Sequence, residues 1–510
     1  MNQICEADAV PFRSGYRASG VVLDISALPS RYSIGDVGPA AVAWIDHLKE
    51  AGQGWWHAVV SDRSGSGDSA HAPHSSFAGN PLLISPDWLI VDGLLDPHDC
   101  RCVTFPEDSI DYDVVIPFKH WLLEKAWKRF NSGARSDLRP LYEQFRRKQG
   151  HWLEDYALFE GLKAKYRVTN YRELPVDLVR RRLHALVDAR QELTGQTDLV
   201  RFSQFLLYRQ TRRLKEYARF RGLRLIGDLP FSVDARSCDV WVSPELFVYD
   251  GRRRADIEGD LIPLWFKSSD ALRMDNDRRR TLDRVSYRWC VDRLHALLTR
   301  VDVARVNSRA ISPKGRRAND GARTTRGARQ LYKRHGQSGG LGSYGIHPDL
   351  SGSLTSYDRS HLFEVRNVQF TFDGLSRKMN PAEEYAPNTV VYAAVHEDSG
   401  GLSRSVSSSS QPQICTSDSW ELIRRAWSSM AGLTMISFPD LLNVKEGPEE
   451  CGSRGGHRRW RCSESMLSAS SFYLLRELTK ASNRSVDKRK KSIRPLSRSL
   501  WGKDSLQAIS

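Results

Sequence analysis

The chain has 510 residues, of which 40% are hydrophobic and 14 are tryptophan, and its formal net charge is +15. This composition is typical of a globular protein, and the length suits one large barrel with insertions or several average domains. No apolar run reaches the roughly 18 residues of a membrane span, and the N-terminus lacks the apolar core of a secretion signal. We therefore expect a cytoplasmic protein with no membrane segment.

The cysteines and the basic segments give only weak signals. The eight cysteines show no C-x-x-C pair, and a cluster at His98, Cys100 and Cys102 lacks a fourth metal ligand. We expect reduced, structural thiols, no metal and no cofactor. Positive charge gathers at residues 313–335 and 484–498, but no nucleic-acid-binding motif accompanies it, so solvated loops are the favoured interpretation.

The N-terminal region begins with a short apolar run, Val21 to Ile25, which predicts the first strand. A helix is expected from Pro39, with apolar residues at helical spacing up to Gly52. Two motif-like segments follow the first strand. They read Ile34-Gly-Asp-Val-Gly and Gly65-Ser-Gly-Asp-Ser-Ala-His-Ala-Pro-His-Ser-Ser-Phe-Ala-Gly-Asn-Pro.

Helical periodicity dominates residues 82–220, and we expect these helices to form core and to carry no chemistry. A second clear strand, Leu223-Arg-Leu-Ile-Gly-Asp-Leu-Pro, places Asp228 near its end. A third, around Val301 to Val306, breaks into Arg305, Asn307 and Ser308. A buried strand that ends in polar residues indicates a site at its carboxyl end.

The last strand of interest begins at Asn388 and reads Asn-Thr-Val-Val-Tyr-Ala-Ala-Val-His-Glu-Asp. Strands alternate with helices along the chain, and polar residues gather where strands end. This pattern predicts the α/β class and a (β/α)8 TIM barrel with helical insertions.

The motifs resemble those of the amylomaltases, the 4-alpha-glucanotransferases of glycoside hydrolase family 77. The family pattern Val-Asp-x-x-Arg-[Ile/Val]-Asp-His matches the chain at Val301, Asp302, Arg305 and Val306. The family's Phe-Ala-Gly-Asn-Pro stands at residues 77–81, and its Asn-x-Val-Val-Tyr begins at Asn388. The resemblance covers about residues 17–475, with a gap at 311–343.

The resemblance implies a domain organisation. An N-terminal extension is expected at 1–16 and the barrel at 17–480, with a helical insertion at about 100–220 and a basic low-complexity segment at 311–343. A basic, disordered tail is expected at 481–510.

The resemblance also places the catalytic positions, and all three are substituted. Asn307 takes the place of the family's nucleophilic Asp, and Pro348 takes the place of its acid/base Glu. Glu397 replaces the Asp that stabilises the transition state. A retaining glucanotransferase needs two carboxyl groups about 5 Å apart, and neither an amide nor a prolyl ring can serve. Asp302 is no substitute, because it lies five residues from Asn307 at the far end of the strand.

Other site residues are implied by the same resemblance to bind substrate. They are Asp228, Arg305, His396, Trp56, Asp68, Ser69 and Asn80.

We therefore expect a family member, related to the metabolism of α-1,4-glucan and maltooligosaccharides, with impaired or lost catalysis. It would hold glucan or act beside an active paralogue. Two alternatives stay open: a weakly active 4-alpha-glucanotransferase with a retaining mechanism, and a non-catalytic protein that binds an anionic partner through its basic segments.

Overall fold

The computed structural model describes most of the chain between residues 16 and 485. The described residues are 16–58, 75–101, 103, 105–106, 109–229, 233–249, 260–263, 276–306, 364–368, 370–373, 376–379, 387, 389–393, 416–442, 460–467 and 469–485.

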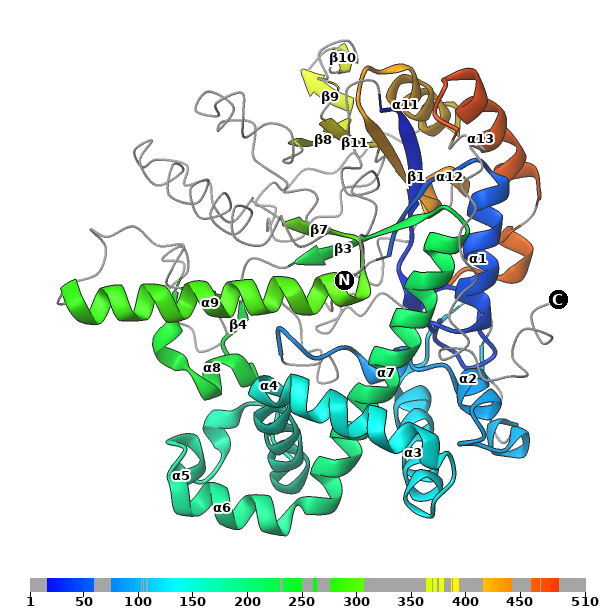
Figure 1. Ribbon diagram of the computed structural model, residues 1–510. Coiled ribbons are helices and arrows are strands. Elements are labelled where there is room, and N and C mark those ends of the chain that lie inside the picture. The colour runs from blue at the N-terminus through cyan, green and yellow to red at the C-terminus, as the bar shows by residue number, and fades with distance from the viewer. Residues whose placement is uncertain are drawn as a thin grey trace, which may run out of the picture.

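A seven-stranded parallel sheet forms the centre of the molecule (Figure 1), in the order β7-β3-β2-β1-β12-β11-β8. Its strands are β1 (Ala18–Val22), β2 (Trp55–His57), β3 (Arg224–Leu229), β7 (Val303–Val306), β8 (Glu364–Val368), β11 (Thr389–Ala393) and β12 (Leu433–Ser437). Two small antiparallel sheets lie apart from it. They comprise β4 (Val233–Asp234), β5 (Phe247–Tyr249) and β6 (Asp260–Pro263), and β9 (Phe370–Asp373) with β10 (Ser376–Met379).

The strand order is that of a TIM-type barrel. Each strand pairs with the described main-sheet strand before or after it in the chain, and β12 pairs with β1 to join the two chain ends. The sheet is also curved. The Arg305 guanidinium of the edge strand β7 lies 5.0 Å from the ring of Tyr392 on β11, although these two strands are not paired. The predicted parallel α/β architecture is confirmed. Closure by an eighth strand between β7 and β8 falls on residues 307–363, outside the described residues.

Alternate residues of the strands fill two separate cores. Trp55, Ile226 and Val303 pack with residues of β1, β11 and β12 inside the curved sheet. Their neighbours in the chain, such as Trp56 and Leu225, face the helices and join the large outer core. This division follows from the pleat, which sends successive side chains to opposite faces.

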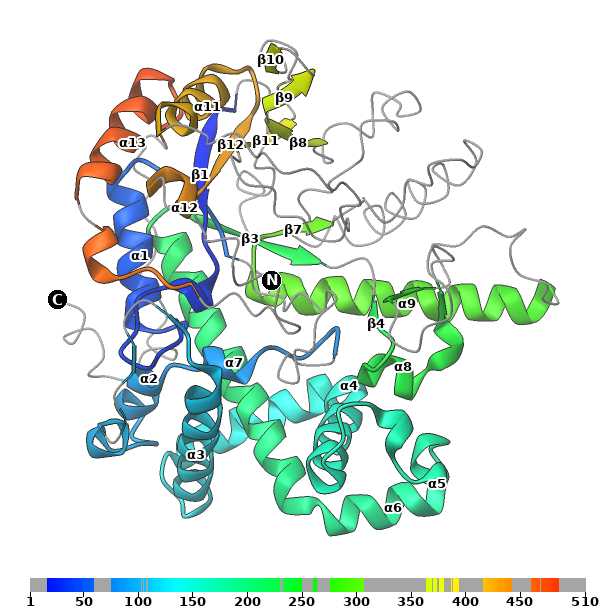
Figure 2. The ribbon, with the colours of Figure 1, turned by 180° about the vertical axis from the view of Figure 1, so that it is seen from behind.

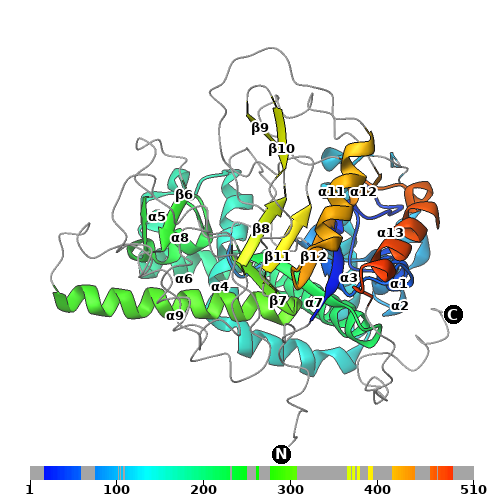
Figure 3. The ribbon, with the colours of Figure 1, turned by 90° about the horizontal axis from the view of Figure 1, so that it is seen from above.

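Helices cover the outside of the sheet. On the flank of β1, β11 and β12 lie α1 (Pro39–Glu50), α11 (Thr416–Ser428), α12 (Phe438–Leu442) and α13 (Ala469–Ala481), seen from above in Figure 3. The helix predicted from Pro39 is confirmed, and its apolar stripe, Trp44, Ile45 and Leu48, is fully buried.

The segment between β2 and β3 contains six α-helices within the described residues. They are α2 (Pro86–Val91), α3 (Tyr112–Asn131), α4 (Arg139–Tyr166), α5 (Val176–Val179), α6 (Leu183–Glu192) and α7 (Thr194–Phe220). After β3 come α8 (Cys238–Val242) and the long α9 (Asn276–Arg300), which contacts β3, β7 and α7 (Figure 2). No helix within the described residues is both long and apolar enough to cross a membrane.

Arg484 differs from its expected place in a disordered tail. Its side chain is fully buried beyond α13 and donates to four main-chain carbonyls, those of Ala18, Trp427, Ser429 and Ala431. This arginine, which the sequence assigned to a basic tail, instead joins the end of α13 to β1 and to the segment that follows α11.

Candidate functional site at the carboxyl ends of the strands

Four polar side chains meet inside the curved sheet near the carboxyl ends of four strands. They are His57 of β2, Asp228 of β3, Arg305 of β7 and Tyr392 of β11. Each comes from the last two residues of its strand. In a parallel barrel this end carries the ligand site, so the cluster marks the mouth of the fold.

An ion pair between Asp228 and Arg305 is the strongest interaction of the cluster. The two residues are register partners on neighbouring strands. Arg305 Nε lies 2.5 Å from Asp228 Oδ1, and Arg305 Nη2 lies 2.8 Å from Oδ2. This fork-to-carboxylate geometry fixes both planar groups and uses both carboxylate oxygens.

His57 and Tyr392 complete the cluster across the inside of the sheet. His57 Nε2 lies 3.3 Å from Asp228 Oδ1, and its Nδ1 lies 3.4 Å from the Tyr392 hydroxyl. The imidazole and the phenol ring meet edge to face, with centroids 5.8 Å apart. Because β2 and β11 are not paired strands, only the curvature of the sheet brings these two side chains together.

The electrostatics of the cluster keep Asp228 ionised. Burial alone would raise the pKa of its carboxyl group, but the charges and hydrogen bonds of Arg305 and His57 outweigh burial and hold that pKa well below its ordinary value. The same pairing overcomes burial and raises the pKa of Arg305. Burial raises the pKa of the Tyr392 phenol to about 12, so this hydroxyl stays protonated at neutral pH.

Apolar packing closes the inside of the sheet beneath the cluster. Trp55 is fully buried, and its indole Nε1 donates to the Tyr16 hydroxyl at 2.8 Å. Gly20 makes room for it, because a Cβ there would lie 2.4 Å from the Trp55 carbonyl oxygen and 2.8 Å from Met435 Sδ. The interior is thus a packed core with a polar mouth.

The structure places four of the residues that the sequence singled out. It brings Asp228 and Arg305 together at the mouth. Trp56 is fully buried on the helix-facing side of β2, where its indole donates to the Leu23 carbonyl at 2.9 Å. Asn80 caps a short 3-10 helix by accepting from the Leu82 amide at 2.9 Å.

The remaining predicted site residues lie outside the described residues. They are Asn307, Pro348, Glu397, His396, Asp68 and Ser69.

Sequence reasoning missed His57 and Tyr392. The signal was available in the spacing, since each is a polar group two residues after an inward-facing apolar one, Trp55 and Val390. In strands buried on both faces this spacing does not say which face is inward, so the contact was not predictable.

Asp302 sits at the opposite end of β7 from the mouth, as the sequence argument expected. Its carboxylate accepts from Arg219 Nε at 2.6 Å and from the Leu225 amide at 2.9 Å. It therefore joins α7 to the amino ends of β3 and β7 and has a structural role.

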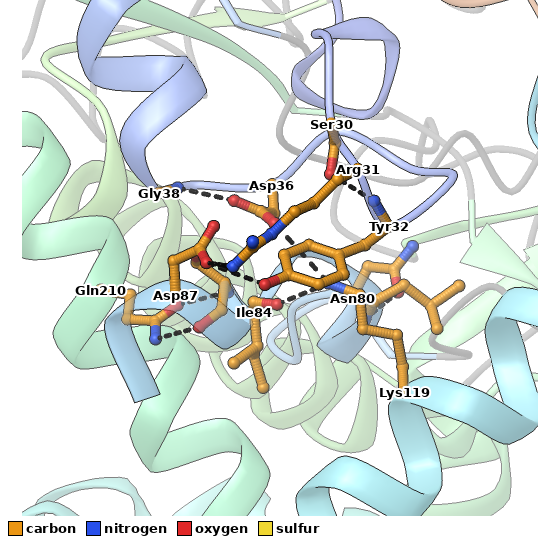
Figure 4. Close-up of polar contacts among 12 residues, drawn as sticks. Ser30, Arg31, Tyr32, Asp36, Gly38, Asn80, Ile84, Asp87, Lys119 and Gln210 are labelled. Carbon is orange, nitrogen blue, oxygen red and sulfur yellow. Dashed lines mark hydrogen bonds and ion pairs between the residues drawn. The ribbon is translucent and has the colours of Figure 1, made fainter. Parts of the chain in front are cut away.

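A second polar cluster holds the loops that precede α1 and α2 (Figure 4). Asp36 Oδ1 accepts from the Gly38 amide at 2.9 Å, and its Oδ2 lies 3.7 Å from Lys119 Nζ, which donates to the Ile84 carbonyl at 2.7 Å. Burial raises the pKa of Asp36 and lowers that of Lys119. Since Asp36 belongs to the Ile34-Gly-Asp-Val-Gly segment, this motif serves loop structure.

Within the described residues, no three His, Cys, Asp or Glu side chains are placed so that they could hold a metal ion together. The four cysteines that the structure describes, Cys100, Cys238, Cys290 and Cys462, are free and buried. The fold and the mouth cluster define an α/β protein of the TIM-barrel type with a site at the carboxyl ends of its strands.

Comparison with known proteins supports the family that the motifs resemble. The family model described as 4-alpha-glucanotransferase matches residues 23–262. The 4-alpha-glucanotransferase of Synechocystis is 28% identical over 478 residues, which cover 87% of this chain and 94% of that protein. The enzyme of Aquifex aeolicus is 33% identical over 294 residues, but this match spans only 59% of that protein and 57% of this chain.

Solved structures agree on the fold. An amylomaltase from Streptococcus agalactiae, solved in complex with acarbose, superposes with a TM-score of 0.71 and 22% identity over 92% of this chain and 100% of that one. An amylomaltase from Corynebacterium glutamicum gives a TM-score of 0.62 at 14% identity, over 92% of this chain and 76% of that one. The family model, the curated relatives and the solved structures together support a member of the 4-alpha-glucanotransferase (amylomaltase) family, which the motifs predicted.

Proposed function

We propose that this chain is an α-1,4-glucan-binding member of the family in which transferase activity is lost or strongly reduced. Family membership and the mouth cluster support retention of a glucan groove. One relative of the same fold was solved in complex with acarbose, which is consistent with an oligosaccharide ligand for the family.

The observation that carries the proposal is the ion pair between Asp228 and Arg305. Asp228 is the carboxylate among the four polar residues that the structure describes at the mouth. Both of its oxygens are paired with Arg305. Its lowered pKa makes it a poor proton donor at neutral pH, and its bidentate pairing makes it a poor nucleophile. Asp228 thus positions Arg305 and His57 and does not replace a missing acid.

The family's nucleophile position follows this pair in the sequence. Asn307 directly follows the end of β7 and stands two residues after Arg305 in the sequence. An amide there has no negative charge with which to form a glycosyl-enzyme intermediate.

The other two positions strengthen the proposal. Pro348 offers no proton to a leaving oxygen, and Glu397 is one methylene longer than the family's Asp. A displacement of about 1 Å at a reacting group can reduce the rate on the order of 100-fold.

Incubation of the full chain with maltotriose, followed by chromatography for glucose and longer oligomers, tests the loss of activity. We expect no disproportionation above that of an Asn307→Ala control. Turnover that exceeds this control would refute the proposal and favour the weakly active transferase. An Asn307→Asp variant shows in parallel whether restoring one carboxylate is enough.

Calorimetric titration with maltoheptaose tests glucan binding separately. We expect saturable binding that an Arg288→Gln variant preserves, since Arg288 lies on α9 with its side chain 85% exposed. No heat of binding at millimolar maltoheptaose would refute the binding part. Co-purification with active family members tests whether this chain acts as the partner of an active paralogue.

The anion-binding alternative rests on basic segments outside the described residues. Its test is deletion of the tail, which should begin at residue 486, because Arg484 is buried within the fold. Unchanged binding to an anionic matrix after that deletion would count against the tail.

A further inference from the structure

His57 is a buried titratable side chain at the mouth. It is the last residue of β2, and only 1% of its surface is exposed. Its Nε2 lies 3.3 Å from Asp228 Oδ1, and its Nδ1 lies 3.4 Å from the Tyr392 hydroxyl. The imidazole therefore stands between an anion and a neutral hydroxyl, and each ring nitrogen faces a different partner.

The charged and titratable groups around His57 come from three other strands. Asp228 belongs to β3, Arg305 to β7 and Tyr392 to β11, whereas β1, which pairs with β2, carries no titratable side chain. Among these residue types, imidazole alone ordinarily changes its charge between about pH 5 and pH 8. Asp228 stays ionised across this range, and Tyr392, whose pKa is about 12, keeps its hydrogen.

The neutral form of His57 has one favourable position for its hydrogen. A bare lone pair that faced the Asp228 carboxylate would be repelled, so Nε2 carries the hydrogen and Nδ1 accepts. Since the Tyr392 hydroxyl keeps its hydrogen, it donates to Nδ1. In this state the hydrogen of Tyr392 is used inside the cluster.

Protonation of His57 reverses this contact. Both nitrogens of an imidazolium are donors, so Nδ1 must then donate to the Tyr392 oxygen. Arg305 also hydrogen-bonds to Tyr392, and a guanidinium can only donate. The Tyr392 hydrogen therefore has to turn away from both His57 and Arg305 to another acceptor.

The charge of the mouth changes with the same proton. Asp228 and Arg305 balance each other when His57 is neutral, and protonation of His57 adds one positive charge. A hydroxyl that accepts from a charged donor becomes a stronger donor itself, because hydrogen bonds in a chain polarise one another. A sugar hydroxyl oxygen at the mouth would thus meet a stronger donor in acid than at neutral pH.

Packing holds the two side chains in place. His57 and Tyr392 are 1% and 7% exposed, and their rings meet edge to face with centroids 5.8 Å apart. Trp55 and Val390, two residues earlier on the same strands, belong to the core inside the sheet. Because the pair cannot easily separate, a change of protonation is answered by the hydrogen of Tyr392 and not by a movement of the rings.

We propose that His57 is a proton-operated switch of the glucan site, whose protonation frees the Tyr392 hydroxyl hydrogen to bind a sugar hydroxyl. This inference rests on the proposed glucan binding and adds the regulation of that site by pH. The proton and the glucan favour each other's binding, and by thermodynamic linkage the effect is reciprocal.

Calorimetric titration of the full chain with maltoheptaose at about pH 8, pH 6.5 and pH 5 tests the switch. We expect the affinity to rise about three- to tenfold from pH 8 to pH 5, because a charge-assisted chain of hydrogen bonds replaces a neutral one. Equal affinity at the three pH values would overturn the switch and leave glucan binding intact. No binding at any pH would instead refute the proposed function.

Two variants assign the pH dependence to this pair. His57→Gln keeps a polar side chain that does not titrate, and Tyr392→Phe keeps the ring without the hydroxyl. Each should lose the gain in affinity between pH 8 and pH 5, while circular dichroism checks that it folds. His184→Gln removes an exposed histidine of α6 and should behave as wild type. Full pH dependence in either of the first two variants would refute the assignment.

Nuclear magnetic resonance of the ring nitrogens gives a readout that does not require glucan. In protein with ¹⁵N-labelled histidine, the His57 signals are those that His57→Gln removes. We expect the neutral ring to carry its hydrogen on Nε2. Saturating maltoheptaose should raise the titration midpoint of His57 by about 0.5–1 pH unit, which is the reciprocal of a three- to tenfold change in affinity. A neutral ring with its hydrogen on Nδ1, or a midpoint that bound maltoheptaose leaves unchanged, would overturn the proposal.

Discussion

The guanidinium of Arg305 clasps both oxygens of the Asp228 carboxylate, at 2.5 Å from Nε and 2.8 Å from Nη2. These two residues stand on neighbouring parallel strands and are register partners. The pair fixes the mouth of the curved sheet. We therefore expect the pair to matter for folding, independently of any catalytic activity.

Removing one partner of this pair should destabilise the protein strongly. Asp228→Asn leaves the Arg305 guanidinium, whose side chain is only 22% exposed, without a counter-charge, which we expect to lower the free energy of unfolding by about 3 kcal/mol. Urea denaturation followed by circular dichroism measures the effect. The control is Asp137→Asn, which breaks an exposed pair with Arg135 and should change stability by no more than about 1 kcal/mol. Equal effects of the two variants would contradict the structural role of the pair.

Acid should unfold the protein partly through Asp228. Its folded pKa lies below the unfolded value of about 3.9, so the unfolded state binds more protons as the pH falls through and below about 4. Stability from this group is thus fully present above that pH and is lost below it. Denaturation at a series of pH values from 7 to 3 should show a shallower decline for Asp228→Asn than for wild type. Parallel curves for the two proteins would disprove the assignment.

Lys215 should make stability depend on alkaline pH. Its ammonium donates to the Leu298 and Val301 carbonyls at 2.7 and 2.6 Å, and burial lowers its pKa to about 8. Between this pKa and the unfolded value of about 10.4 the unfolded state binds more protons, so this group's contribution to stability rises with pH across that interval.

The difference in unfolding free energy between wild type and Lys215→Met should therefore shift in favour of wild type from about pH 8 to pH 10. Lys480→Met, at a half-exposed residue of α13, is the control and should show no such trend. A difference that stays constant with pH would rule out the proposed titration.

Arg484 should be required for the packing of α13. Arg484→Met removes one donor from each of four carbonyls, of which those of Trp427 and Ser429 keep a hydrogen bond from Arg17. We expect a loss of several kcal/mol, at about 1–3 kcal/mol for each group left unsatisfied that water does not reach. Arg476→Met on the exposed face of α13 should change stability by less than about 0.5 kcal/mol. Thermal and urea denaturation compare the two. Similar stabilities would mean that the carbonyls find other donors.

Two glycines should respond to alanine in opposite directions. Gly20→Ala would bring a Cβ within 2.6 Å of Trp55 Cβ and should destabilise the protein by about 1–3 kcal/mol or more. Gly150 lies inside α4 with nothing within 4 Å, so Gly150→Ala should stabilise it by about 0.5–1 kcal/mol. Unfolding midpoints of the two variants, measured together, should move apart. Shifts in the same direction would contradict the packing inside the sheet.

Much of the fold and part of the site could be predicted from the chain alone. Asp228 and Arg305 were predicted at strand ends, because short β-branched runs broke into polar residues there. Their direct pairing needs the register of β3 against β7, which local patterns do not encode. Nothing in the basic run around Arg484 distinguished a buried arginine from a solvated one.

By itself the sequence determined the alternation of strands and helices, the family motifs and the amide at position 307, because all three are local properties of the chain. Only the tertiary structure decided that Trp55 faces inward and Trp56 outward, and that His57 meets Tyr392 across the sheet. The physical reason is that a parallel strand buried on both faces shows no alternation of polarity. Which face becomes the interior, and which distant strands share it, is settled when the sheet curves and its two edges approach each other.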